Sequence, residues 1–448
     1  MPHVARDLYQ KCREYRDSAD ARAQGFYPYF RCIDETHGNY VICEGQRQIM
    51  IGSNNYLGLA QDERVIEAAC EAARKYGSGC TGSRLLNGTI RLHTQLEEAL
   101  ADFLQREAVL LFSTGFFANQ GALASLTEEG DLILCDRENH ASIIDGCQFA
   151  PAKLVPYRHN SAVSLRNRLK RQPAEAGKLV VMDGVFSMSG DIADLRPQIE
   201  VAKEFGARVY VDEAHSLGVL GLQGRGAVHQ FGVNQDVDII MGTFSKSLGS
   251  MGGFIAGDGQ MIEYLKHRAR CFIFTASLAP AVAGGVLKAL EIVQQEPGRI
   301  EQLWRNTRKM HEGFKHIGFQ IGTTQTPIVP ILIGSEAKAF LFTQRLYEEG
   351  VFATPAIYPA VRYSEAIVRT SYMATHTEKD LDNVLEIFAK LALELGTFDD
   401  PAYAEPGKRK ANVFDFRLED REGEEAIREV APDAAAWNGQ GVHPAVSR

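Results

Sequence analysis

The sequence lacks the features that mark several classes of protein. Its eight cysteines are scattered, with no CxxC pair and no His/Cys cluster at zinc spacing, so we expect free thiols and no metal site. No apolar run reaches the roughly 18 residues of a membrane-spanning helix, and residues 1–17 contain no apolar stretch typical of a signal peptide. The formal net charge of −9 offers no basic surface to nucleic acid. We therefore expect a cytoplasmic protein with no nucleic-acid partner.

The 448 residues, 45% of them hydrophobic, are enough for a large core divided between domains. Short apolar runs alternate with helical patterns over residues 61–290, and these runs are apolar at consecutive positions. That pattern is typical of an α/β domain whose mostly parallel sheet is buried on both faces. Longer helices and fewer strands over 291–396 indicate a smaller α+β C-terminal domain.

The two ends of the sequence differ in pattern and composition from residues 61–396. Residues 1–60 look like an N-terminal arm, with an amphipathic helix over about 1–24 followed by two strands, "NYVICEG" and "RQIMIG". Residues 397–448 form a charged, Pro- and Ala-rich tail, which we expect to wrap the surface or to be partly disordered. Peripheral contact with a membrane or with a carrier protein stays open for this tail.

Polar residues end several of the apolar runs, where open α/β sheets bind their ligands. Asp212 ends "ARVYVD", and Lys246 follows "DIIMG" among small residues that carry no other charge. A pyridoxal phosphate (PLP) ring needs both, because an amine bonds to its aldehyde and a carboxylate keeps its ring nitrogen protonated. An exposed lysine in a surface ion pair is the alternative interpretation of Lys246.

Other residues could complete such a cofactor site. "FSTGFFANQG" places Thr114, Gly115 and Phe116 at a helix start whose N–H groups would bind the phosphate, although ordinary helix capping explains the same pattern. His140 could stack on the ring, and His215 in "DEAHS" could bond its phenolic oxygen.

The sequence resembles the α-oxoamine synthases, which condense an amino acid with an acyl thioester and lose carbon dioxide. The resemblance runs from about residue 45 to 395 through "NNYLGLA", "YGSGCTGSRLLNGT", "FSTGFFANQG", "DRENHASIIDG", "DGVFSMSGDIADL", "VDEAHSLGVLGLQGRGA", "GTFSKSLGSMGG", "FTASLAP" and "VRTSYMATHT". It implies a fold-type I PLP-dependent transferase, similar to aspartate aminotransferase, and a homodimer with active sites at the subunit interface.

The resemblance also assigns roles to individual residues. It makes Lys246 the Schiff-base lysine, Asp212 the pyridinium partner, His140 the stacking residue and His215 the partner of the phenolic oxygen. Further family positions match Ser187 and Thr243 for the cofactor, Thr275 and Ser277 for the phosphate of the neighbouring subunit, and Arg369 and Asn54 for the amino-acid carboxylate. Asn55 is the alternative to Asn54.

Within the family, "VDEAHS" and "GTFSKS" are most similar to the serine palmitoyltransferases. This likeness implies that L-serine and a long-chain acyl-CoA such as palmitoyl-CoA give 3-ketosphinganine, coenzyme A and carbon dioxide, in sphingolipid biosynthesis. An 8-amino-7-oxononanoate synthase or a glycine C-acetyltransferase is the alternative, as is an acyl-carrier protein for the acyl donor. A non-catalytic partner subunit is a third possibility, which the presence of Lys246 disfavours.

Overall fold

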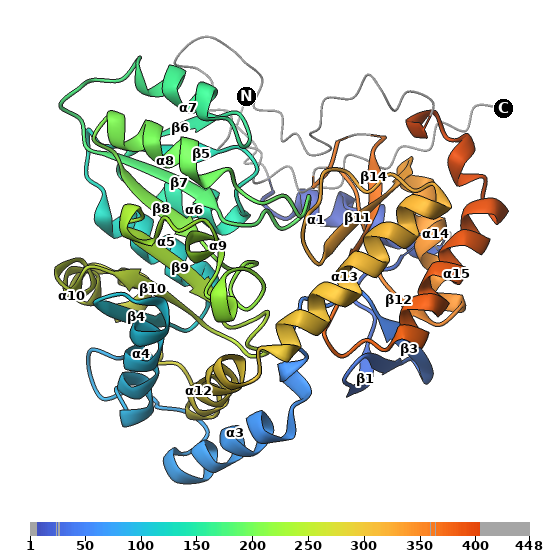
Figure 1. Ribbon diagram of the computed structural model, residues 1–448, viewed down its shortest axis with the longest axis horizontal. Helices are drawn as coiled ribbons and strands as arrows, with labels where there is room; N and C mark the ends of the chain where they lie inside the picture. The colour runs from blue at the N-terminus through green and yellow to red at the C-terminus, as the bar shows by residue number, and fades with distance from the viewer. Residues whose placement is uncertain (1–6, 24, 26, 359, 363, 404–448) are drawn as a thin grey trace.

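Three β-sheets organise the part of the chain that the computed structural model describes, residues 7–403 without 24, 26, 359 and 363. Figure 1 shows the seven-stranded sheet and its helices on one side of the molecule, and the four-stranded and three-stranded sheets with α13, α14 and α15 on the other. None of the helices within these described residues combines the length and apolar composition that a membrane crossing requires.

The large sheet contains the predicted strands. Its order is β4 (Ala108–Phe112), β10 (Gly253–Gly257), β9 (Ile239–Thr243), β8 (Arg208–Asp212), β7 (Lys178–Asp183), β5 (Leu132–Asp136) and β6 (Lys153–Tyr157). Strands β9, β8, β7, β5 and β6 pair in parallel, and β10 runs antiparallel to both of its neighbours. The prediction of a mostly parallel, doubly covered sheet is confirmed. Strand β6 was not expected, and it tolerates Pro156 because it is an edge strand.

Helices cover both faces of this sheet. Two of them, α5 (Gly115–Leu126) and α6 (Ala141–Phe149), start directly after β4 and β5 and pack against each other. The remaining helices of this half are α3 (Glu63–Tyr76), α4 (Arg91–Leu104), α7 (Ala162–Leu169), α8 (Leu195–Glu204), α9 (Ala227–Gln230), α10 (Gly259–Arg268), α11 (Arg270–Ile273) and α12 (Pro280–Gln295). Burial of apolar side chains on both faces of the strands is the main stabilising contribution.

The four-stranded sheet joins an N-terminal segment of the chain to its C-terminal half. Strands β1 (Ile33–His37), β2 (Tyr40–Cys43) and β3 (Gln46–Met50) form an antiparallel meander, and β3 pairs in parallel with β12 (Val351–Phe352). The predicted N-terminal strands therefore belong with the C-terminal half. That half also contains β11 (Ile328–Gly334), β14 (Ala366–Ser371), β13 (Thr354–Ala356), α13 (Gly298–Ile317), α14 (Glu336–Glu348) and α15 (Glu378–Glu394).

One prediction for the ends needs correction, and a short part of the predicted tail lies within the described residues. In place of one helix over 1–24, the described residues contain α1 (Gln10–Glu14) and α2 (Asp17–Ala23), with an extended Tyr15 between them and no buried residue in either helix. Both are too short to be stable without tertiary packing. At the other end, residues 397–403 pack on the small half, where the Lys338 ammonium lies 3.0 Å from Asp400. Residues 1–6 and the predicted tail from 404 onward lie outside the described residues.

Candidate active site

The carboxyl ends of the parallel strands place the predicted site residues at one edge of the sheet. Asp183 and Asp212 are register partners on β7 and β8, and Asp212 is the register partner of Met241 on β9. Lys246 lies in the loop of residues 244–252 between β9 and β10. The sheet thus brings the lysine and the aspartate onto neighbouring strand ends, as the sequence predicts.

Lys246 is partly buried on a loop that is fixed at both ends. The Phe244 N–H donates to the Gly252 carbonyl at 3.0 Å, and the Gly249 N–H donates to the carbonyl of Lys246 at 2.9 Å. Burial lowers the pKa of the Lys246 amine, the nearby Asp212 raises it, and the Arg369 charge lowers it again, so that the net shift is downward. A lysine of this kind releases its proton more readily and becomes a nucleophile or a base.

Asp212 is almost fully buried and accepts two hydrogen bonds. Its Oδ1 accepts from the Ala214 N–H at 2.9 Å and its Oδ2 accepts from Asn119 Nδ2 at 2.8 Å. These bonds fix the orientation of the carboxyl group in a poorly solvated site. Such a carboxylate can hold the proton of a ring N–H.

The start of α5 forms a cradle that only glycine permits. The Thr114 hydroxyl accepts a hydrogen bond of 3.1 Å from the Phe117 N–H. The N–H groups of Gly115 and Phe116 are therefore available to an external anion. A Cβ at Gly115 would lie 2.9 Å from Thr243 Oγ1, and a Cβ at Gly253 would lie 2.6 Å from the Gly115 Cα. The helix start therefore sits against the ends of β9 and β10, beside Thr243.

Two histidines flank this cradle. His140 is the N-cap of α6, its N–H donates to Asp183 Oδ2 at 3.1 Å, and burial lowers the pKa of its imidazole although the Asp212 charge opposes the shift. His215 is buried, and its Nδ1 shares a hydrogen bond of 2.7 Å with the Tyr56 hydroxyl. Burial, with the Lys246 charge, holds the pKa of His215 well below its usual range, so that this imidazole is neutral near pH 7.

Arg369 on β14 gathers residues from three regions of the chain. Its Nε donates to the Ser187 carbonyl at 2.8 Å and its Nη2 donates to Asn54 Oδ1 at 3.0 Å. Asn55 is engaged elsewhere, since its Oδ1 accepts from the Ala60 N–H at 3.3 Å. Of the two asparagines, Asn54 is thus the one beside the arginine. Ser187 meets Arg369 through its backbone, not through its hydroxyl.

Thr275 and Ser277 lie apart from the other predicted residues. The Ser277 N–H and hydroxyl both donate to the Gly82 carbonyl at 3.0 Å, and Ser83 pairs with Ala276 in an antiparallel bridge. Thr275 is exposed. The segments "GSGCTGSRLLNGT" and "FTASLAP" therefore pair with each other within one chain, and neither residue bonds to the cradle of the same chain.

The sequence analysis missed three buried side chains that support this site: Asn119, Ser142 and Tyr56. All are at most 3% exposed. Asn119 is the one polar side chain whose burial among small residues of "GFFANQG" could have drawn attention. Asp183 keeps its Oδ1 without a hydrogen-bond partner, and burial, with the charge of Asp212, raises the pKa of its carboxyl well above the usual range.

Glu213 faces away from the site, although it follows Asp212 directly. Its carboxylate accepts from the N–H groups of Ala227 and Val228, both at 2.8 Å, and from the hydroxyl of Ser216. It therefore caps α9 and holds the loop that precedes it. Glu213, the glutamate of the motif "VDEAHS", therefore has a structural role in this fold.

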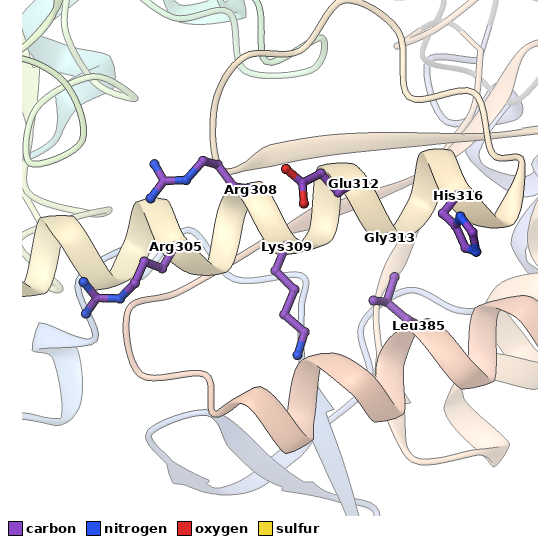
Figure 2. A pocket seen from close by; sticks show the side chains of 7 residues that line it. All are labelled: Arg305, Arg308, Lys309, Glu312, Gly313, His316 and Leu385. Atoms are coloured by element: carbon purple, nitrogen blue, oxygen red, sulfur yellow. The ribbon is translucent and has the colours of Figure 1, made fainter.

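A second concave surface, of about 660 Å³, lies between α13 and α15 (Figure 2). None of the predicted site residues lines it. Its lining residues are Arg305, Arg308, Lys309, Glu312, Gly313, His316 and Leu385. Figure 2 shows Lys309 pointing toward α15, where its ammonium lies 2.6 Å from Asp382. The surface is therefore separate from the strand-end site.

The strand-end site contains the groups that a pyridoxal phosphate requires. These are an amine with a lowered pKa, a buried carboxylate one strand away, unused N–H groups at a helix start and an imidazole at the site rim. By contrast, His, Cys, Asp and Glu side chains form no cluster suited to a metal ion within the described residues. The site fits this organic cofactor.

Comparison with known proteins gives consistent matches. The family model described as aminotransferase class I and II matches residues 46–388. The chain is 46% identical to a serine palmitoyltransferase of Bacteroides thetaiotaomicron over 86% of this chain and 97% of that protein. It is also 46% identical to an 8-amino-7-oxononanoate synthase of Symbiobacterium thermophilum, over 79% of this chain and 91% of that protein.

A solved structure is similar over its whole length. Serine palmitoyltransferase from S. paucimobilis, with a bound PLP–myriocin aldimine, superposes with a TM-score of 0.85 at 37% identity, covering 87% of this chain and 100% of that one. At this identity and coverage the likeness extends to the fold and the family.

Proposed function

Because the chain belongs to the α-oxoamine synthases of the class I and II aminotransferase family, we propose that it joins L-serine to a long-chain acyl-CoA with loss of carbon dioxide. The products are 3-ketosphinganine, coenzyme A and carbon dioxide when the acyl group is palmitoyl. The protein is a PLP-dependent acyltransferase of sphingolipid biosynthesis, acting in the cytoplasm. The observation that carries the proposal is that Lys246 and Asp212, at the strand ends of the large sheet, lie close enough to Arg369 on β14 for both charges to act on the lysine amine.

Cofactor binding falls to residues of the large sheet. The Gly115 and Phe116 N–H groups would hold the phosphate beside Thr243, Asp212 would hold the proton of the ring nitrogen, and His140 would stack on the ring. His215, whose Nδ1 is taken by Tyr56, turns its Nε2 to the phenolic oxygen. When bound, PLP supplies an aldehyde that bonds to amines and a protonated ring that accepts the electron pair of a carbanion.

Substrate binding falls to Arg369 and Asn54. The guanidinium is held by Asn54 and by the Ser187 carbonyl, so that its geometry is set before the amino acid arrives. A carboxylate bound there gains charge-assisted hydrogen bonds in a site from which most water is excluded. The α-carbon of the amino acid then lies between this arginine and Lys246.

Proton transfer at the α-carbon falls to Lys246. Its lowered pKa gives a larger fraction of free amine at neutral pH than an exposed lysine has. The amine takes the α-proton at Nζ, and the resulting carbanion attacks the thioester carbonyl, from which the thiolate of coenzyme A leaves. Loss of carbon dioxide from the β-keto acid and return of a proton from Nζ complete the reaction.

The amino acid and the acyl donor define the second candidate, an 8-amino-7-oxononanoate synthase that uses L-alanine and a pimeloyl thioester. The observation in its favour is that the named relative of this activity is as similar, at 46%, as the serine palmitoyltransferase. The greater coverage of the serine palmitoyltransferase match and the segment "GTFSKS" favour L-serine.

A homodimer completes the proposal, and exposed apolar side chains support it. Leu86 and Phe274 are 80% and 73% exposed and lie on the paired segments that contain Gly82 and Ser277. Large apolar groups at this exposure are costly in a monomer. We expect a second copy of the chain to cover them, so that Thr275 and Ser277 reach the phosphate site of that copy.

The test is to incubate the purified chain with PLP and titrate it with L-serine, L-alanine and glycine, recording visible absorbance and released coenzyme A. We expect a yellow protein whose spectrum responds to L-serine, and no lysine-linked band in Lys246→Ala. A response to L-alanine with pimeloyl thioester would replace the first candidate by the second. A colourless wild-type chain would refute both and favour a non-catalytic subunit.

A further inference from the structure

A chain of hydrogen bonds runs from the buried Asp212 to His140 through two buried side chains. Asn119 Nδ2 donates to Asp212 Oδ2 and to Ser142 Oγ, each at 2.8 Å. Ser142 Oγ lies 2.8 Å from His140 Nδ1. Asn119 is fully buried and Ser142 is 2% exposed. The acid at the end of β8 is therefore linked through two buried side chains to His140, which reaches the surface at the start of α6.

The direction of each bond follows from groups that act in one way only. A carboxylate only accepts, so the side of the Asn119 amide that faces Asp212 must be its NH₂ group. The opposite oxygen then accepts from the Tyr210 hydroxyl at 2.6 Å, which is consistent with this orientation. The amide therefore donates to Ser142 Oγ as well as to Asp212.

The same reasoning settles the protonation of His140. Since Ser142 Oγ accepts the Asn119 N–H, the hydroxyl hydrogen of Ser142 is free to point at His140 Nδ1. The backbone N–H of Ser142 also points at Nδ1, at 3.2 Å, and an N–H can only donate. Both contacts need the lone pair of Nδ1, so the proton of the neutral ring is on Nε2.

We propose that Asn119 and Ser142 are positioning residues that keep His140 neutral with its proton on Nε2, while the same amide holds Asp212 in place. The meaning of this inference rests on the proposed function. A neutral imidazole can lie against a positively charged cofactor ring without repulsion, and Nε2 then presents one N–H donor on the side of the ring opposite to Ser142.

Several charged groups surround His140 and enter its titration. They are Asp212 and Asp183 at the strand ends, Lys246 after β9, Asp145 on α6 and His215 after β8. Protonation would turn Nδ1 from an acceptor into a donor. The new N–H would then point at the hydroxyl and the backbone N–H of Ser142, which both donate to the neutral ring. The hydrogen-bond chain therefore lowers the pKa of His140, as the Lys246 charge does, whereas the carboxylates raise it.

The test is nitrogen NMR of the full chain labelled with ¹⁵N-histidine, without cofactor, with His140→Gln to assign the signals. We expect a protonated Nε2 and an unprotonated Nδ1 for His140 at pH 7.5. In Ser142→Ala the pKa of His140 should rise by about half a unit to one unit, because one hydrogen bond to the neutral form is lost. Ser142→Thr keeps the hydroxyl and should restore the wild-type titration.

Ser161→Ala is the matched control, because the Ser161 hydroxyl caps α7 and accepts from the Ser164 N–H at 3.2 Å, far along the chain from the site. It should leave the His140 signals unchanged. A wild-type His140 with its proton on Nδ1 would overturn the proposal. So would a Ser142→Ala chain with the wild-type titration.

A second measurement tests the link to Asp212. Asn119→Leu removes both donations, and we expect the apparent dissociation constant for PLP at pH 7.5 to rise about tenfold. An unchanged constant would refute the link, and if this variant does not fold, the Ser142→Ala titration decides alone. Because the NMR needs no substrate, a chain that uses another amino acid defeats the proposed function and leaves this inference intact.

Discussion

Replacing His159 should change how stability depends on pH. This histidine is buried after β6, with Nδ1 3.1 Å from Asp136 Oδ1 and Nε2 3.5 Å from both Glu138 Oε2 and Asp191 Oδ2. Burial lowers the pKa of His159, but the hydrogen bond to Asp136 and the nearby carboxylates of Asp191 and Glu138 outweigh it and raise the pKa to about 10. The ring is thus a cation that holds three carboxylates together.

The magnitude follows from the difference between the folded and unfolded states. An unfolded histidine titrates near pH 6.5, so between about 6.5 and 10 the folded chain binds one proton more than the unfolded chain. The contribution of His159 is fully present below pH 6.5 and falls by about 1.4 kcal/mol per pH unit as the pH rises toward 10. Between pH 7 and 8.5 this loss is about 2 kcal/mol.

Urea unfolding at pH 7.0 and 8.5 measures this loss. We expect the free energy of unfolding of the wild type to fall by about 2 kcal/mol more than that of His159→Gln, which has no titrating group. His267→Gln is the control, since His267 is an exposed residue of α10 beside Glu263. Parallel pH dependences in the wild type and His159→Gln would refute the reasoning.

Three further predictions concern the site and its supports. Arg369→Ala should raise the KM for the amino acid about 10- to 100-fold with a smaller effect on kcat, measured by steady-state kinetics, because charge-assisted bonds to the carboxylate are lost; equal losses in both constants would contradict this role. Gly115→Ala should weaken PLP binding about tenfold or more by spectroscopic titration, because its Cβ would lie 2.9 Å from Thr243 Oγ1, whereas Gly298→Ala, with open space around it, should not. Glu213→Asp should lower the thermal midpoint by a few degrees, because its shorter carboxylate side chain would no longer reach both N–H groups of α9. The preference between L-serine and L-alanine should stay within about twofold of the wild type. A switch of amino acid would show that Glu213 acts on the substrate.

The large sheet could be predicted from sequence because most of its strands are apolar at consecutive positions and several end in a polar residue. For the same reason Asp212 and Lys246 could be assigned to one edge. The reversal of β10 could not, since "GGFIAG" is as apolar as its parallel neighbours and direction leaves no mark on composition. Strand β6 was hidden by Pro156, which is tolerated only at a sheet edge.

The supporting side chains were harder to predict than the reactive ones. Lys246 and Asp212 attract attention by their charge, whereas Asn119 and Ser142 act through hydrogen bonds whose partners are distant in sequence. The contact between Asn54 and Arg369 joins residues 315 positions apart, and no local pattern separates Asn54 from Asn55. Conversely, Glu213 was given weight by its place in a motif, while its side chain points into the scaffold.

The antiparallel direction of strand β10 determines how the backbone of Lys246 is held. A parallel successor to β9 would need a long crossover, usually through a helix, whereas an antiparallel one lets the chain turn back within residues 244–252. Hydrogen bonds across that short turn anchor the lysine backbone, so only the four-carbon stem is left to swing. Under the proposed function, one tethered arm of fixed length would reach both the aldehyde of the cofactor and the α-proton of the substrate.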